Sequence, residues 1–495
     1  MSGVFGNPWL YNADDSFYSE TIDQSLRFND GDSPALSKAY SVAQTNTKKL
    51  TISVWLKRGN LGIRSTILFA KGGGAGKLSF QTTDKIYFNA FDTGYNGFES
   101  NALFRDTTAW YHIVAQADSD GQTGANINRV YVNGVELSNN KTSSFTPDDS
   151  ATMLLRNGVT TYIGDDTDGA YHFDGYLAEL NVIDGSVVAP TEFAETKDNI
   201  WIPKSYSGSY GDNGFRLDFA DSSAIGNDVS GQNNDYTVSG GGSPTLVASD
   251  VVPDSPTNNF AVGNPLSSTS NNTFAEGNLK VTGSGVNYYN YLSSMGMETG
   301  GKYYFEVYSN ARYASYAAIG ICKPSSFTHT MSVYNTAGVM AYVQGQYVKY
   351  LNATIGSTAN LYNNNPYLFS FAIDLDNNIF HFRTDGGSWE NSGDPAGGTG
   401  GFAIPADLQG QTLMPWFGPN GPKIQILNFG QDSSFADNKT SGSAGAADGN
   451  GIGDFFYAVP SGFLALASSN LPDPTIIDGS EHFNTVLYTG DDSTQ

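Results

Sequence analysis

Acidic side chains at alternate positions along a strand are the first pattern in this chain that could perform catalysis. Hydrolysis of a glycosidic bond with retention of configuration needs two carboxyl groups about 5–5.5 Å apart, and a strand places every second side chain on one face. Glu179 lies in such a strand, but Asn181 and Ile183 stand where the further carboxyl groups would be required. The pair cannot be assembled there, so the sequence predicts that the chain is not an enzyme.

Histidine and cysteine offer no better reactive site. The histidines show no metal-ligand spacing and are predicted to be structural: His112, His172, His329, His381 and His482. Cys322 is the one cysteine, and its apolar surroundings in the sequence predict a buried thiol that packs as a small hydrophobic side chain. A single cysteine excludes an intrachain disulfide. The absence of such a disulfide is typical of a chain that folds in a reducing cytoplasm.

Loops that combine aromatic rings with amides or carboxylates are the candidates for ligand binding. Sugars stack their apolar faces on aromatic rings, while polar side chains fix the hydroxyl groups. The predicted ligand-binding residues are Tyr95, Asn96, Tyr171, Trp389 and Asn391. The alternative for each ring is an ordinary aromatic side chain that covers the end of a β-sandwich.

Composition indicates which elements must position these loops. The chain has 495 residues with 57 Gly, 29 Tyr and 30 Phe, and only 15% of its residues are charged. Aromatic residues favour strands and glycine favours turns, so an all-β protein of two or three domains is predicted. The net charge of -24 argues against nucleic acid and anionic membranes as partners. No signal peptide and no apolar run of about 18 residues is visible, so membrane insertion is not expected.

Strand signals are clear in the first half. Ile52, Val54 and Leu56 alternate along one strand and are expected to share its buried face. Further along, Asn133-Gly134 predicts a two-residue hairpin turn in which both residues have positive φ. The one helix predicted in this half spans 190–195 and is one or two turns long.

Several of these segments, taken in order, resemble a laminin-G or concanavalin A-like domain: 26–28 (LRF), 55–57 (WLK), 109–114 (AWYHIV), 131–134 (YVNG) and 173–179 (FDGYLAE). Four segments of the second half resemble a SPRY domain: 301–307 (GKYYFEV), 371–376 (FAIDLD), 413–418 (LMPWFG) and 426–431 (ILNFGQ). The two resemblances imply an all-β fold of two tandem antiparallel β-sandwiches, a concanavalin A-like jelly roll followed by a SPRY-like sandwich, with short connectors. Both kinds of domain are used mainly for binding.

These resemblances also imply a domain plan and a metal site. The expected segments are an N-terminal anchoring arm at 1–24, a laminin-G/concanavalin A-like domain at 25–200, a connector with strands at 201–257, a SPRY-like domain at 258–463 and a C-terminal tail at 464–495. No cofactor is predicted, with one alternative left open. A structural Ca²⁺ of the kind that many laminin-G-like domains carry would involve Asp165, Asp166 and Asp168.

The opening residues, the joined sandwiches and connectors such as 201–204 (WIPK) together resemble a family of tailed-phage virion proteins common among marine phages. This resemblance implies a surface appendage, a tail fibre, spike or head fibre, that mediates adhesion to the host surface by binding glycan. It places the chain on the virion surface after synthesis in the host cytoplasm. The expected partners are other virion proteins through the N-terminal arm, host-surface glycan and further copies of the chain in a homo-oligomer. The alternative is a capsid decoration or tail component that binds only other virion proteins.

Overall fold

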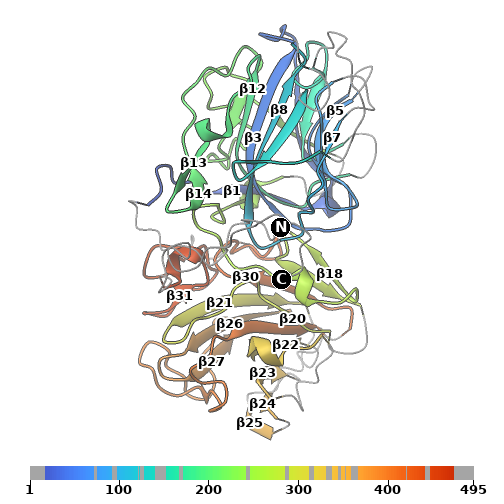
Figure 1. The fold of residues 1–495 in the computed structure, drawn as a ribbon. Coiled ribbons are helices and arrows are strands. Elements are labelled where there is room, and N and C mark those ends of the chain that lie inside the picture. The colour runs from blue at the N-terminus through green and yellow to red at the C-terminus, as the bar shows by residue number, and fades with distance from the viewer. Residues whose placement is uncertain are drawn as a thin grey trace, which may run out of the picture.

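The fold is all-β, as predicted (Figure 1). The computed structural model describes residues 17–472 apart from 72–74, 92–96, 121, 123–126, 140–151, 167–170, 241–245, 285–288, 311–316, 330–336, 344–346, 352, 358–365, 420 and 441–445. Tyr95, Asn96 and Asp168 fall outside these residues, as do 1–16 of the predicted arm and most of the tail. In the described part of the chain, no helix has the length and hydropathy that a membrane span requires.

The first sandwich packs two antiparallel sheets face to face. One sheet has the order β10 (Val135–Glu136), β9 (Asn128–Val132), β8 (Trp110–Asp118), β3 (Lys49–Arg58), β12 (Gly175–Asp184), β1 (Ser25–Phe28) and β17 (Val251–Val252), with β15 (Phe215–Leu217) also paired to β12. The other has the order β16 (Thr237–Gly240), β2 (Pro34–Ala39), β11 (Thr160–Ile163), β4 (Ser65–Lys71), β5 (Ala75–Phe80), β6 (Ile86–Asn89) and β7 (Phe98–Glu99). Strands β15, β16 and β17 come from the connector, which therefore adds to this sandwich.

Local sequence signals in the first sandwich form the elements expected of them. Ile52, Val54 and Leu56 of β3 all lie in the core between the two sheets, as predicted from their alternation. Asn133 and Gly134 join β9 to β10 with φ of 47° and 77°, which confirms the predicted hairpin turn. Both signals are short in range, so no distant part of the chain is needed to interpret them.

The helix predicted at 190–195 is wrong beyond its first turn. A 3₁₀ turn, η3 (Pro190–Glu192), is followed at once by strand β13 (Ala194–Lys197), which pairs with β14 (Ile200–Pro203). Phe193 and Ala194 are buried against the outer face of the neighbouring sheet. Packing of this hairpin on the sheet therefore outweighs the weak local preference for a helix.

The same outer face is covered by the start of the described chain. Phe17 and Ile22 are buried, and Ile22 packs with Trp55 and Trp110 of the sheet. The backbone N–H of Ile22 also donates to the Thr257 hydroxyl over 3.1 Å. Residues 17–24 of the predicted arm thus lie within the folded body.

The second sandwich is built in the same way. One sheet has the order β18 (Asn272–Ala275), β19 (Lys280–Gly283), β30 (Ile424–Asn428), β21 (Lys302–Ser309), β26 (Tyr367–Asp374), β27 (Ile379–Thr384) and β28 (Phe402–Ala403), with β31 (Leu464–Ala465) parallel to β21. The other has the order β20 (Tyr291–Leu292), β29 (Met414–Pro419), β22 (Ala317–Cys322), β23 (Val339–Val343), β24 (Tyr347–Tyr350) and β25 (Ala353–Ser357). Short 3₁₀ turns complete the described elements: η1 (Asp30–Asp32), η4 (Ala248–Asp250), η5 (Pro265–Ser267), η7 (Pro324–Ser326) and η8 (Ser468–Asn470).

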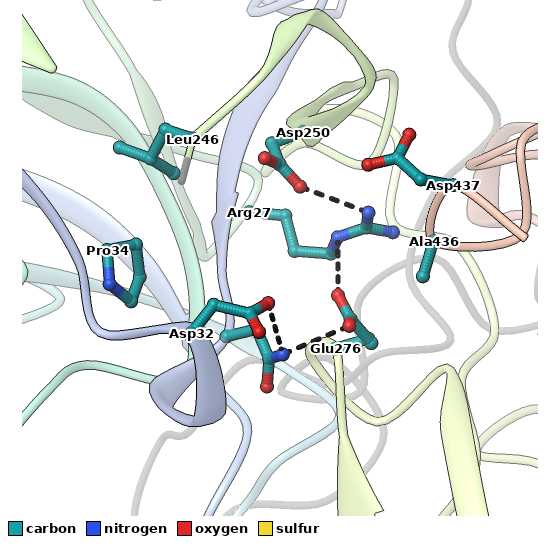
Figure 2. Close-up of a pocket in the computed structure, with 9 residues that line it drawn as sticks. Arg27, Asp32, Pro34, Leu246, Asp250, Glu276, Ala436 and Asp437 are labelled. Carbon is teal, nitrogen blue, oxygen red and sulfur yellow. Dashed lines mark hydrogen bonds and ion pairs between the residues drawn. The ribbon is translucent and has the colours of Figure 1, made fainter. Parts of the chain in front are cut away.

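Each sandwich has its own apolar core, and Figure 1 shows the two stacked end to end. Arg27 of β1 lies at the junction and is almost fully buried. Its guanidinium is 2.8 Å from the Asp432 carboxylate, 3.1 Å from Asp250 and 3.6 Å from Glu276. Figure 2 shows Asp250 and Glu276 approaching Arg27 from the connector and the second sandwich. One buried cation therefore ties three parts of the chain together.

A second buried cation joins β3 to the entry of the second sandwich. The Lys57 ammonium donates to Asp254 and Asn259 over 2.8 Å each and to the Phe260 carbonyl over 3.0 Å. Trp110 Nε1 donates to the other oxygen of Asp254 over 3.1 Å. Burial lowers the pKa of Lys57 and raises the pKa of Asp254, and each charge opposes the shift of the other. The two sandwiches are thus joined by fixed polar contacts as well as by the chain itself.

Candidate functional site

Tyr171 lies on the first sandwich beside a group of charged side chains. It belongs to the segment between β11 and β12, and its carbonyl accepts from the Thr66 N–H of β4 over 3.0 Å. The Arg64 guanidinium lies over the Tyr171 ring, with its carbon 4.5 Å from the ring centroid. Lys77 of β5 and Tyr87 of β6 point away from the core on the same sheet, because their neighbours Leu78, Phe80, Ile86 and Phe88 point into it. We call Arg64, Lys77, Tyr87, Asp166 and Tyr171 the Tyr171 patch.

Charges within this patch are unevenly balanced. The Lys77 ammonium lies 3.8 Å from the Asp166 carboxylate and 5.8 Å from the centroid of the Tyr87 ring. Burial lowers the pKa of Lys77, Asp166 raises it, and the nearby charge of Arg64 lowers it further. Burial also raises the pKa of Tyr87. The patch therefore combines aromatic faces with two neighbouring cations and one carboxylate.

Two of the three predicted metal ligands face other side chains. Asp165 lies 2.9 Å from the His172 ring nitrogen Nδ1, and Asp166 faces Lys77. Asp168 is outside the described residues, so the structure does not test the predicted trio. Across residues that the structure describes, no group of three His, Cys, Asp or Glu side chains is arranged to hold a metal ion. The calcium site stays a prediction.

Trp389 lies on the second sandwich in the loop after β27 and is also covered by an arginine. The Arg383 guanidinium carbon is 4.7 Å from the Trp389 ring centroid and 5.1 Å from the Tyr457 ring centroid. Arg383 points outward because Phe380 and Phe382 of the same strand point into the core. We call Arg383, Trp389 and Tyr457 the Trp389 patch.

Asn391 has a structural role beside this patch. It is exposed with φ of 52°, and its side-chain amide donates to the Gly401 carbonyl. The Gly401 N–H returns a bond of 3.1 Å to the Asn391 carbonyl. Asn391 therefore closes the loop that carries Trp389, which leaves the ring and Arg383 as the parts available to a ligand.

Sequence reasoning missed Arg64 and Arg383. Arg64 directly precedes β4, and Arg383 lies near the end of β27. The aromatic partner of each lies in a loop. Among residues that the structure describes, neither arginine has a hydrogen bond or an ion pair with another side chain. Arg383 closely precedes Trp389 in the sequence, and this proximity was the signal that could have found it. Arg64 is distant from Tyr171 in the sequence and had no such signal.

Glu179, the carboxyl group considered for hydrolysis, has both oxygens occupied. They accept from the Arg216 guanidinium over 2.8 and 3.0 Å. Glu179 also has φ of 47° and lies in a bulge where β12 shifts its register against β3. The bulge breaks the regular alternation assumed from the sequence, because Leu177 and Leu180 both point into the core.

The cavity and grooves beside the connector are less suited to a sugar. A small cavity of about 20 Å³ beside Arg27 (Figure 2) has room for about one water molecule. Two open grooves of about 430 and 680 Å³ flank residues 246–251. Tyr236 is the one aromatic residue among their described walls, and it is 4% exposed. A stacked ring is therefore better placed at the two patches.

Comparison with known proteins supports a lectin-like first sandwich. Residues 29–192 match the model of the concanavalin A-like lectin/glucanases superfamily, and this range contains the Tyr171 patch. A search of curated protein sequences finds no match to the chain.

Solved structures that match parts of this chain cover 33% to 45% of it. They include the SPRY domain of human HERC1, with 12% identity over 33% of this chain and 96% of that chain and a TM-score of 0.26. The TRIM65 PSpry domain has 12% identity over 34% and 88% of the two chains and a TM-score of 0.24. The SAP-like pentraxin of Limulus polyphemus has 14% identity over 34% and 78% and a TM-score of 0.26. We draw no functional conclusion from these structures; what the comparisons show is that residues 29–192 are similar to a concanavalin A-like lectin domain.

Proposed function

We propose that this chain is a glycan-binding adhesion protein that holds its ligand without transforming it. The observation that carries the proposal is the Tyr171 patch, in which an aromatic face lies among charged hydrogen-bonding groups on a lectin-like sandwich. Rings of this kind cover the apolar face of a pyranose, and the surrounding polar groups orient its hydroxyls. The Trp389 patch offers a second surface of the same type.

We also propose that the chain does not hydrolyse its ligand. Glu179 cannot serve as a general acid or nucleophile while both of its oxygens are bonded to Arg216. No cofactor is proposed, and a structural Ca²⁺ near Asp165 and Asp166 remains the open alternative.

The proposed setting is the surface of a phage particle, as a tail fibre, spike or head fibre. Support for it comes from the resemblance of the joined sandwiches and connectors to tailed-phage virion proteins. Display in many copies suits a weak site, because a millimolar affinity corresponds to only about 4 kcal/mol. Other virion proteins would anchor the chain, and the net charge of -24 favours solubility and keeps nucleic acid away. The alternative is a capsid decoration or tail component that contacts only other virion proteins.

Binding to a glycan array tests the proposal. Tyr171→Ala and Trp389→Ala each remove a stacking face, and we expect each to weaken binding at its patch by about tenfold. Tyr347→Ala is the matched control, because Tyr347 also lies under a cation, with Lys349 at 5.0 Å, but belongs to neither patch. If the wild-type protein binds none of the host polysaccharides but binds capsid or tail protein tightly, glycan binding is rejected in favour of the alternative.

A further inference from the structure

Arg64 and Arg383 differ from the other well-placed arginines of this chain. Arg27, Arg58 and Arg216 each face a carboxylate within 3.2 Å. Within the described residues, Arg64 and Arg383 face aromatic rings and have no carboxylate partner. The chain contains 49 Asp and Glu against 25 Lys and Arg, so a cation without an acidic partner is not the result of a shortage of acids.

An arginine held over an aromatic ring can keep its hydrogen-bond donors available. The attraction to the ring acts through the face of the guanidinium, while its N–H groups point outward along the edges in a planar fork. That fork matches the two oxygens of a carboxylate. Because the ring already restricts the side chain, little further ordering is needed when such a ligand binds.

Arg383 has a donor that a ligand of this kind could satisfy. Its guanidinium carbon lies 4.7 Å from the Trp389 ring centroid and 5.1 Å from that of Tyr457. Nε is buried without a hydrogen-bond partner, but the two Nη groups are not among the buried unpartnered atoms. The Nη groups are therefore the donors that an acceptor brought by a ligand would meet.

At the Tyr171 patch, the positive charge of Arg64 lies near that of Lys77. Arg64 is close enough to Lys77 to lower the pKa of the lysine, and Asp166 lies 3.8 Å from Lys77, so two neighbouring cations face this carboxylate. An anionic group would relieve the repulsion between the two cations.

We propose that both patches bind the carboxylate of an acidic saccharide, with Arg64 and Arg383 as the carboxylate-binding residues and the sugar ring placed against the neighbouring aromatic face. This inference deepens the proposed glycan binding and rests on it. An acidic saccharide combines the two features that each patch can recognise, an anion with planar geometry and an apolar ring face. The net charge of -24 opposes a polyanion over the whole surface, so binding of an acidic saccharide would depend on the two arginines.

The test uses affinity electrophoresis of the full chain through gels that contain polygalacturonate, carboxyl-reduced polygalacturonate, dextran or dextran sulfate. Reduction converts each carboxylate to a hydroxymethyl group and leaves the sugar backbone in place. We expect retardation by polygalacturonate and at least tenfold weaker retardation by the reduced polymer. Retardation by dextran sulfate equal to that by polygalacturonate would overturn the carboxylate assignment.

Variants assign the effect to the two residues. We expect Arg64→Gln and Arg383→Gln each to weaken retardation by polygalacturonate by at least threefold and the double variant to abolish it. Arg383→Lys keeps the charge without the fork and should restore less than half of the lost affinity. Lys323→Gln removes the same charge from the loop after β22 and should change nothing. Thermal melting of each variant shows whether it is folded.

Two outcomes separate the inference from the proposal beneath it. Retardation by dextran or by the reduced polymer, unchanged in both arginine variants, would overturn the acidic ligand and leave glycan binding in place. If none of the four polymers retards the protein and no glycan on the array binds it, both the acidic ligand and glycan binding are overturned.

Discussion

Glu306 is a carboxyl group buried on the outer face of the second sandwich. It accepts from the backbone N–H groups of Phe456 and Tyr457 over 2.8 and 2.9 Å and from the Tyr304 hydroxyl over 2.8 Å. These bonds hold the segment near Tyr457, and thereby one side of the Trp389 patch, on the sheet. Burial outweighs the donors and raises the pKa of Glu306 to about 7.

A raised pKa makes stability depend on pH in a definite direction. The folded protein holds the Glu306 proton more tightly than the unfolded chain, so the stabilisation is complete below about pH 4.5 and is lost as pH rises through about 7. We expect the free energy of unfolding to fall by about 3 kcal/mol across this range on account of Glu306. Urea unfolding at pH 4 to 8 should show a smaller slope for Glu306→Gln than for the wild type. Equal slopes would contradict the assignment.

Metal removal is the second prediction for individual side chains. Because Asp165 faces His172 and Asp166 faces Lys77, we expect EDTA to leave the melting temperature unchanged within 1 °C. The check is a thermal melt with EDTA and one with added Ca²⁺. A rise of several degrees with Ca²⁺ would establish the open alternative, a structural calcium ion.

The turn at Asn133 and Gly134 lies close to a side chain of another hairpin. A Cβ added to Gly134 would lie 2.8 Å from the Trp201 ring. Trp201 Nε1 in turn donates to the His112 ring over 3.0 Å. One glycine therefore allows a hairpin to approach the aromatic group on the outer face of the sheet.

Gly134→Ala tests this close approach. Positive φ and contact with Trp201 should together lower the free energy of unfolding by about 2–4 kcal/mol. Gly158→Ala is the matched control, since Gly158 has φ of 78° with open space around it and should cost only about 1 kcal/mol. Urea unfolding of both variants gives the difference. Equal effects would show that Trp201 moves away freely.

The whole molecule depends on the buried charges between its sandwiches. Arg27→Met would leave Asp250, Glu276 and Asp432 without their cation, and we expect a loss of about 3–5 kcal/mol in the free energy of unfolding. Lys49→Met is the control. Its partner is the exposed Asp120, and it should cost less than about 1 kcal/mol. Comparable losses in the two variants would mean that the junction contributes little.

The sequence allowed the fold class, the hairpin at Asn133 and the buried face of β3 to be predicted, because each depends on neighbours a few residues apart. It did not reveal the bulge at Glu179, where one inserted residue reverses the faces that follow. Nor did it reveal Arg64 over the Tyr171 ring or the three carboxylates around Arg27, because those contacts form only when distant segments fold together. For the candidate site, the rings could be proposed from the sequence and their cationic partners could not.

The buried ion pairs of Arg27 and Lys57 between the sandwiches have a mechanical consequence if the protein serves the proposed adhesion. Pulling the two sandwiches apart along the long axis of Figure 1 loads these contacts directly, in parallel with the chain. Desolvated charge pairs give way over a displacement of about one water diameter, because entering water screens them at once. We therefore expect the linkage to behave as stiff and brittle under tension, rigid up to a threshold force and then extending abruptly while both sandwiches stay folded.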